Sequence, residues 1–212
     1  MDRRDFLKAS GIFWVGAAGP YALRLVSSSQ ASTAPMPPRP DRRRWGMVID
    51  LTKCAPECTA CLDACRKENN VALHGDRRWD IYWIRKVTLK KNHAASSRQI
   101  SLPLLCNHCD EPPCAQVCPV QATYKRPDGI VIVDHHRCIG CRYCMIACPY
   151  NARYFNYKEN HDWPNKNFPK RSHGVAESCT FCAHLLEAGK RPACVEACEK
   201  MYAQAMLVGD LN

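Results

Sequence analysis

The sequence predicts an α+β fold, rich in loops, in which β-hairpins and short helices surround bound metal. Two observations predict it. Sixteen cysteines fall into four groups of four with none left over, and the second and third groups flank a hairpin-like segment, which makes an internal repeat. The groups are Cys54, Cys58, Cys61 and Cys65; Cys106, Cys109, Cys114 and Cys118; Cys138, Cys141, Cys144 and Cys148; and Cys179, Cys182, Cys194 and Cys198.

The spacing of the cysteines distinguishes between disulfides, zinc sites and iron–sulfur clusters. In a disulfide framework, four cysteines within 11 to 13 residues, as in the first three groups, would have to close very short loops. A zinc site commonly uses two well-separated Cys-x-x-Cys pairs. The third group instead has three cysteines at two-residue gaps, Cys138, Cys141 and Cys144, followed by Cys148 and Pro149. This is the bacterial ferredoxin run, whose fourth cysteine binds the neighbouring cluster, so sixteen thiolates predict four [4Fe-4S] clusters.

The sequence gives no sign of a haem attachment site, because no cysteine pair is followed by histidine in the haem-attachment pattern. His108 lies inside the segment Cys106-Asn-His-Cys109. We interpret it as a polar loop residue near a cluster, with metal ligation as the alternative.

Residues 1–31 resemble a twin-arginine export signal. Arg3 and Arg4 precede Phe-Leu-Lys, a moderately apolar stretch over residues 9–26 and small residues up to Ala31. The alternative is an ordinary amphipathic helix. The twin-arginine route carries folded cargo, which suits clusters inserted in the reducing cytoplasm. We therefore expect a periplasmic protein at the outer face of the cytoplasmic membrane, held there by partners or by a retained N-terminal segment.

No other stretch approaches the roughly 18 apolar residues of a membrane-spanning helix. We expect the body of the chain to be soluble and to lack a C-terminal anchor.

The net charge supports the cluster prediction. The formal balance is 30 − 20 = +10, of which residues 1–31 carry +2, so the remainder carries +8. Four oxidised clusters with their thiolates carry about −8, since each carries about −2. The loaded protein is then near neutral, which argues against nucleic acid as a partner. Cations beside the motifs are expected to offset the cluster charge: Arg66, Lys67, Arg137, Arg142 and Lys190.

The first half of the body alternates short elements with cysteine groups. Residues 32–44 form a Pro/Arg-rich linker without a core-forming pattern. Residues 45–51 predict a strand, and residues 62–69 predict one or two helical turns. Residues 79–89 are rich in β-forming residues and predict a long strand, and residues 99–105 lead into the second cysteine group.

Residues 122–134 predict a β-hairpin, with Asp128-Gly129 as the turn signal. Together with the flanking cysteine groups this hairpin amounts to a complete two-cluster ferredoxin unit, and residues 152–157 are expected to supply its closing strand.

A polar loop follows over residues 158–174, and residues 183–190 are helix-like. We interpret Trp163 and Phe168 in that loop as locally packed, with partner docking as the alternative.

Several stretches carry a family resemblance: Met47–Cys54, Leu105–Cys114, Asp128–Asp134, Arg137–Cys144 and Gly209–Leu211. On these motifs, residues 45–211 resemble the four-cluster ferredoxin-like subunits of membrane-linked respiratory oxidoreductases, which include the β subunits of dimethyl-sulfoxide and polysulfide reductases. The resemblance implies two bacterial-ferredoxin-like modules, a central half over residues 106–157 and an outer half over residues 45–105 and 158–212.

The resemblance also implies a crossed ligand pattern. Cys106, Cys109 and Cys114 would share a cluster with Cys148; Cys138, Cys141 and Cys144 with Cys118; Cys54, Cys58 and Cys61 with Cys198; and Cys179, Cys182 and Cys194 with Cys65. Two departures from the family pattern fall on one of these clusters. The gap from Cys54 to Cys58 is one residue longer than usual, and Cys198 lacks the proline that commonly follows it. This cluster is therefore the one whose type could differ.

The function implied is that of an electron-transfer subunit without a substrate site of its own. It would pass electrons between a quinone-reactive, multi-span membrane subunit and another redox subunit such as a cytochrome. Within the family, the N-terminal segment, the expected lack of a C-terminal anchor and the stretch Gly174–Cys182 are most similar to the periplasmic DsrO-type subunit of the sulfite-reductase-linked membrane complex, which suggests sulfur metabolism. Alternatives are a nitrite- or polysulfide-type reductase subunit, a free polyferredoxin, and an iron–sulfur enzyme with an open iron site.

Overall fold

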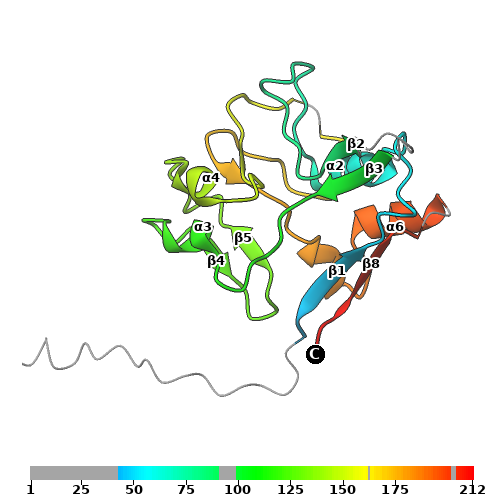
Figure 1. Ribbon diagram of the computed structural model, residues 1–212. Helices are drawn as coiled ribbons and strands as arrows, with labels where there is room; N and C mark the ends of the chain where they lie inside the picture. The colour runs from blue at the N-terminus through cyan, green and yellow to red at the C-terminus, as the bar shows by residue number, and fades with distance from the viewer. Residues whose placement is uncertain (1–42, 91–98, 162, 202–203) are drawn as a thin grey trace, which may run out of the picture. The chain divides into compact units, whose positions relative to one another are not determined.

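The computed structural model describes residues 43–90, 99–161, 163–201 and 204–212. The export-signal segment 1–31 and residues 32–42 of the expected linker lie outside the described residues. In the described part, short helices and two-stranded antiparallel sheets are joined by loops, which confirms the predicted α+β class (Figure 1). The elements are β1 (Trp45–Ile49), α2 (Ala60–Asn69), β2 (Arg85–Lys90), β3 (Gln99–Leu104), α3 (Pro113–Gln116), β4 (Thr123–Lys125), β5 (Val131–Val133), α4 (Tyr143–Ala147), β6 (Tyr154–Phe155), β7 (Ala176–Glu177), α5 (Ala183–Glu187), α6 (Ala193–Lys200) and β8 (Met206–Asp210).

The strand predicted at residue 45 is confirmed, and its partner comes from the far end of the sequence. β1 pairs antiparallel with β8, from Trp45 opposite Asp210 to Ile49 opposite Met206. Figure 1 accordingly shows the C-terminus beside the start of β1. Side chains alternate across this ribbon, so Met47 and Val208 pack towards the core while Val48 on the other face is 64% exposed. The pairing fixes the first and last cysteine groups to one another.

The helix predicted over residues 62–69 is present and begins two residues earlier. Asn70, whose φ of 51° is left-handed, caps the C-terminal end of α2, and α2 packs against α6. Each helix carries two buried cysteines on the shared side, Cys61 and Cys65 on α2 and Cys194 and Cys198 on α6.

The long strand predicted over residues 79–89 is wrong in its first half. β2 starts only at Arg85 and forms a hairpin with β3. Before it, the backbone turns, with the Trp79 amide donating to the Asp76 carbonyl at 2.8 Å. Ile81 and Trp83 are buried in the core beside the outer cysteines. Their apolar, β-forming side chains reflect burial in an irregular segment, because β-propensity largely measures packing rather than backbone preference.

The central hairpin is confirmed. β4 pairs with β5, and the loop between them closes with the Arg126 amide donating to the Ile130 carbonyl at 2.8 Å. Gly129 has a φ of 85°, which is why glycine suits this turn. The expected closing strand is present as the two-residue β6, and its partner β7, from beyond the polar loop, was not expected.

The polar loop and the following helix agree with the sequence. α5 forms within the helix-like stretch 183–190. Phe168 packs locally, with its ring 4.4 Å from the His184 ring, which confirms the local-packing interpretation for this residue. Among the described helices, none has the length and apolar composition that crossing a membrane requires.

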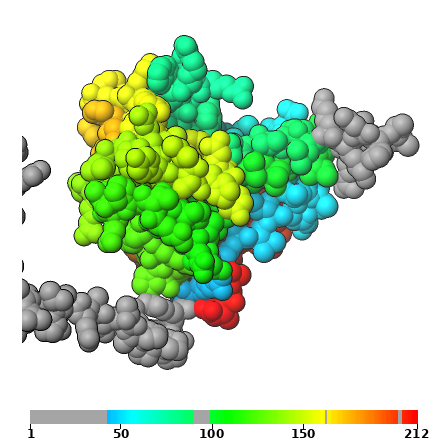
Figure 2. All heavy atoms as spheres, turned by 60° about the vertical axis from the view of Figure 1, so that its left-hand side comes forward, coloured from blue at the N-terminus to red at the C-terminus, as the bar shows by residue number. Residues whose placement is uncertain are grey.

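The buried cores are built largely around cysteine. One cluster of buried residues joins Cys61, Cys65, Cys179, Cys194 and Cys198 to the apolar side chains packed against them. A second combines Cys114 and Cys144 with Val131 and Ala176. α3 packs on α4, and Figure 2 shows the segments that carry the second and third cysteine groups, drawn from green to yellow-green, side by side on one face.

A glycine inside the third cysteine group gives a test of this packing. Gly140 has a φ of 70°, and a Cβ there would lie 2.5 Å from the Gly174 carbonyl oxygen. Gly140→Ala is expected to destabilise the protein by about 2 kcal/mol or more, since strain and a backbone clash add. Gly189→Ala is the matched control, because Gly189 has a φ of 71° but open space around its Cβ position.

Thermal unfolding of the two purified variants, followed by circular dichroism, measures the difference. Gly189→Ala should lose only the conformational term, about 1–2 kcal/mol. Equal losses in the two variants would contradict the close approach of Gly140 to Gly174.

Candidate iron–sulfur centres

All sixteen cysteines lie in the described part of the chain, and every one is a free thiol rather than half of a disulfide. Within the same described residues, no group of three or more His, Cys, Asp or Glu side chains is arranged to hold a single metal ion. In a cubane cluster the four thiolates bind different iron atoms, so its ligands are spaced more widely than those of one ion.

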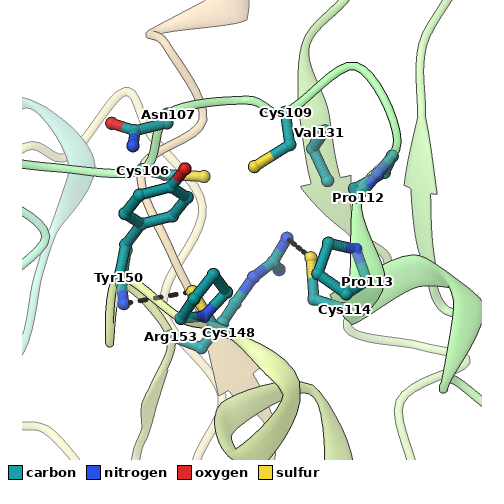
Figure 3. Close-up of a pocket in the computed structure, with 12 residues that line it drawn as sticks. Cys106, Asn107, Cys109, Pro112, Pro113, Cys114, Val131, Cys148, Tyr150 and Arg153 are labelled. Atoms are coloured by element: carbon teal, nitrogen blue, oxygen red, sulfur yellow. Dashed lines mark hydrogen bonds between the residues drawn. The ribbon is translucent and has the colours of Figure 1, made fainter.

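One predicted ligand set surrounds a common cavity in the central half. Cys106, Cys109, Cys114 and Cys148 all line it, together with Arg153. Figure 3 shows the four sulfurs pointing towards a shared space, although Cys148 is 42 residues after Cys106 in the sequence. The fold therefore brings the third-group cysteine to the second group, in the crossed arrangement that the family resemblance implies.

A second predicted set gathers at the irregular first group. The pKa of Cys61 is raised to about 11, chiefly by burial and further by the neighbouring thiols of Cys58, Cys54 and Cys198. Cys198 thus lies within electrostatic range of the first group, even though the Cys54–Cys58 gap is longer than expected and Cys198 lacks a following proline.

The third set forms the most buried site. Burial raises the pKa of Cys179 and of Cys65 well above the ordinary value, and the nearby thiols of Cys182 and Cys194 add to the rise in both cases. Cys65 also raises the pKa of Cys179. The pKa of Cys194 reaches about 12 for the same two reasons, burial first and Cys182 second.

The fourth set has one buried cysteine, Cys144, and three half-buried ones, Cys118, Cys138 and Cys141. Burial raises the pKa of Cys144 to about 11, and the thiols of Cys138, Cys114 and Cys141 contribute to the rise. Cys118, the fourth ligand that the resemblance implies, behaves differently. Burial alone would raise its pKa, but backbone hydrogen bonds, the largest from Thr123, lower it. The Cys118 thiolate is therefore stabilised by the backbone before any iron is bound.

Hydrogen bonds reach the sulfurs of several sets. Backbone amides donate to Cys148 Sγ from Ala152 at 3.4 Å and to Cys179 Sγ from Phe181 at 3.3 Å. The Asn69 side chain donates to Cys182 Sγ at 3.5 Å. Such bonds stabilise thiolate charge and are one means by which a protein sets a cluster's reduction potential.

The cations that reach the thiols are not those expected from the sequence. Four of the five expected cations, Lys67, Arg137, Arg142 and Lys190, are exposed, and Arg66 is half-buried. The charge of Arg153 instead opposes the raised pKa of the Cys114 and Cys144 thiols, and Arg171 does so for Cys65. The charge of Lys86 likewise opposes the raised pKa of the Cys61 thiol. No sequence signal identified these residues, because only Arg153 is close to a cysteine group in the chain.

Arg171 belongs to a buried network beside the outer cysteines. Its guanidinium lies over the Trp83 ring at 4.5 Å and over the Phe168 ring at 4.9 Å, and Nε donates to the Asn69 carbonyl at 2.7 Å. Trp83 Nε1 donates to Glu177 Oε2 at 3.2 Å. Burial raises the pKa of Glu177 to about 7 in spite of these partners. The network ties the polar loop and β7 to the irregular segment before β2.

His108 is held by protein contacts. Its Nδ1 accepts a hydrogen bond from the Val131 amide at 2.9 Å, and its ring meets the Phe181 ring edge-on at 5.3 Å. Burial, with the Arg153 charge as a smaller cause, lowers the pKa of His108 to about 4, so the imidazole is neutral. The geometry favours the interpretation of His108 as a loop residue over that of a metal ligand.

The donor set fits iron–sulfur clusters. Buried thiols that raise each other's pKa stay protonated near neutral pH, because several neighbouring thiolates in a buried site repel one another. Cationic iron removes that obstacle by binding the deprotonated form, so loading a cluster releases protons and stabilises the fold. The residues of each set would supply thiolates, and the cluster would supply one-electron redox chemistry.

Comparison with known proteins identifies the family. Residues 97–210 match the family described as the 4Fe-4S dicluster domain. The Hdr-like menaquinol oxidoreductase iron–sulfur subunit 1 of Archaeoglobus fulgidus is 43% identical, over 100% of this chain and 86% of its own length. A tetrathionate reductase subunit from Salmonella typhimurium is 38% identical, over 99% and 74%. The iron–sulfur cluster-binding subunit of menaquinone reductase from Nitratidesulfovibrio vulgaris is 42% identical, over 72% and 64%.

These relatives define the class of protein as iron–sulfur electron-transfer subunits of oxidoreductase complexes. The chain belongs to this 4Fe-4S dicluster family, as its sequence motifs predicted, and it binds [4Fe-4S] clusters. The number of clusters, the sixteen ligand assignments and the division into halves stay predictions.

The crossed ligand pattern can be tested with Cys198→Ser. This variant is expected to lose the cluster held by the first group, about four of about 16 iron atoms, because Cys198 completes that site. Low-temperature EPR should then lose the same signal as in Cys54→Ser. Cys148→Ser is the control and should remove a different signal. Loss of different signals in the Cys198 and Cys54 variants would contradict the crossed arrangement.

His108→Gln tests the role of this histidine. The variant is expected to keep its full iron content, since His108 Nδ1 is bonded to the backbone. It should lose about 1 kcal/mol of stability with the hydrogen bond to Val131. Iron analysis and thermal unfolding measure the two effects. A loss of about four iron atoms with folding intact would mean that His108 is a ligand.

Proposed function

We propose that this protein carries four [4Fe-4S] clusters and passes single electrons between a quinone-reactive, multi-span membrane subunit and another redox subunit. The observation that carries the proposal is the meeting of cysteines from distant groups in the fold, Cys148 with Cys106–Cys114 and Cys198 with Cys54–Cys61. All sixteen cysteines serve as ligands, in the crossed pattern of the family.

The arrangement supports electron transfer along neighbouring clusters. Cys61 and Cys194, from different outer sets, lie within electrostatic range of each other, and so do Cys114 and Cys144 in the central half. Cys106 packs against the core that contains the outer cysteines, so it links the central half to the outer half. Electrons would enter one half and leave from the other.

The third cysteine group offers a surface for a partner. Ile146, Ile139 and Tyr143 beside its cysteines are 84%, 64% and 58% exposed, respectively. Exposed apolar side chains next to a cluster suit contact with another redox protein. Because every cysteine is used as a ligand, the chain needs no substrate site of its own. An enzyme with an open iron site would instead leave one set with three protein ligands.

The location and pathway rest on the sequence and on relatives. The twin-arginine-like segment supports export, so we place the protein at the outer face of the cytoplasmic membrane. The names of the relatives refer to menaquinol, menaquinone and tetrathionate, which supports quinone-linked sulfur metabolism and the DsrO-type role. A nitrite- or polysulfide-type reductase subunit and a free polyferredoxin are the competing roles.

Metal analysis and redox titration test the proposal. The purified protein is expected to contain about 16 iron and about 16 sulfide per chain, with four EPR-active clusters during reduction. In isolated membranes, a menaquinol analogue should reduce these clusters only when a multi-span membrane subunit copurifies with the chain. Reduction without such a subunit would favour the free polyferredoxin, and little or no iron would refute the proposal.

A further inference from the structure

Arg153 is a buried cation in the central half. It is 1% exposed, and its Nη2 donates to Cys114 Sγ at 3.1 Å. Figure 3 shows its guanidinium pointing into the space that the sulfurs of Cys106, Cys109 and Cys148 also face. The only hydrogen bond found for this guanidinium in the described residues is therefore to a predicted cluster ligand.

The charge of Arg153 has no carboxylate partner in the described part of the chain. Its Nε and Nη1 are buried and have no hydrogen-bond partner there. Arg126 provides a contrast, because it pairs with both Asp128 and Glu187. A buried unpaired cation is strongly unfavourable, so Arg153 requires an anion at the same place. The thiolates of a loaded cluster are that anion.

The Arg153 charge reaches thiols of both predicted central clusters. Arg153 donates to Cys114, and Cys114 packs with Cys144 in one cluster of buried residues. Cys106 and Cys114 belong to one predicted set and Cys144 to the other. A single cation therefore acts on two clusters.

In the internal repeat formed by the second and third cysteine groups, only one of the two copies has an arginine at this position. Cys118-Pro-Val-Gln-Ala-Thr123 corresponds to Cys148-Pro-Tyr-Asn-Ala-Arg153. The two turns are alike: the amide three residues after each cysteine donates to that cysteine's carbonyl at 3.2 Å, from Gln121 and from Asn151, and both residues have φ near 50°. Thr123, at the position equivalent to Arg153, bonds to Cys118 instead. The same turn forms with threonine in the other copy of the repeat, so turn geometry does not explain why the buried, positively charged Arg153 stands here.

We infer that Arg153 is the shared counter-charge of the two central clusters, a positioning residue that raises both of their reduction potentials relative to the outer pair. The inference rests on the ligand assignment of the proposed function. Adding an electron to a cluster adds negative charge, which a fixed cation in a buried site favours. The effect should be larger for the cluster held by Cys114, since Arg153 also donates a hydrogen bond to that sulfur.

The test is an EPR-monitored redox titration of the full-length holoprotein in its complex. The central signals are first assigned with Cys118→Ser and Cys148→Ser. In Arg153→Gln, the reduction equilibrium constant of the Cys114 cluster should fall tenfold or more, which is about 59 mV for one electron. The other central cluster should shift in the same direction by less, and the outer pair should not move. Arg153→Lys keeps the charge and should stay close to the wild type.

Arg137→Gln is the matched control, because it removes an arginine next to Cys138 that is 66% exposed. It should leave all four potentials unchanged. Wild-type potentials in an iron-replete Arg153→Gln would overturn the inference, and so would an equal fall in Arg153→Lys. If Arg153→Gln does not assemble, the lysine variant alone decides between charge and packing. A wild-type protein without the central signals would instead refute the proposed function.

Discussion

The cost of gathering thiolates in a buried site governs this structure. Eight of the sixteen cysteines have thiols whose pKa is raised by burial, and in seven of these neighbouring thiols add to the rise. Such sites are unfavourable as anions until iron compensates their charge. Folding and metal loading are therefore coupled. The polypeptide needs only to bring four sulfurs to each place, and the cluster then contributes the stability that a larger apolar core would otherwise provide.

This coupling explains why so little regular structure suffices. Two-stranded sheets and helices of four to ten residues would not form a stable domain alone. Here the contacts between elements hold distant parts of the chain together. β1 pairs with β8 and α2 packs on α6, which joins the two ends of the described chain, and α3 packs on α4 in the central half. These contacts bring cysteines of different groups close to one another. The crossed ligand arrangement that the family resemblance implies would follow from these contacts rather than from any single loop.

The surroundings of the clusters differ between the two halves. In the outer half the half-buried cation Arg171 is stacked on aromatic rings and lies near Glu177, within a network that also fixes the loop. In the central half the hydrogen-bond partner of Arg153 is Cys114, a predicted cluster ligand. The two predicted halves can thus hold clusters of different potential, because buried charge is effective at low dielectric and exposed charge is screened by water.

The sequence alone determined the chemistry and the local elements that depend on neighbouring residues. Cysteine spacing identified the clusters, Asp128-Gly129 identified the central hairpin, and the α2 helix followed from its local pattern. The pairing of β1 with β8, the irregular backbone around Ile81 and the stacking of Arg171 on Trp83 and Phe168 were decided only by the tertiary structure. Each of these features depends on residues far away in the chain. A strand needs a partner strand and a packed side chain needs neighbouring side chains, and the local sequence does not show which residues these are.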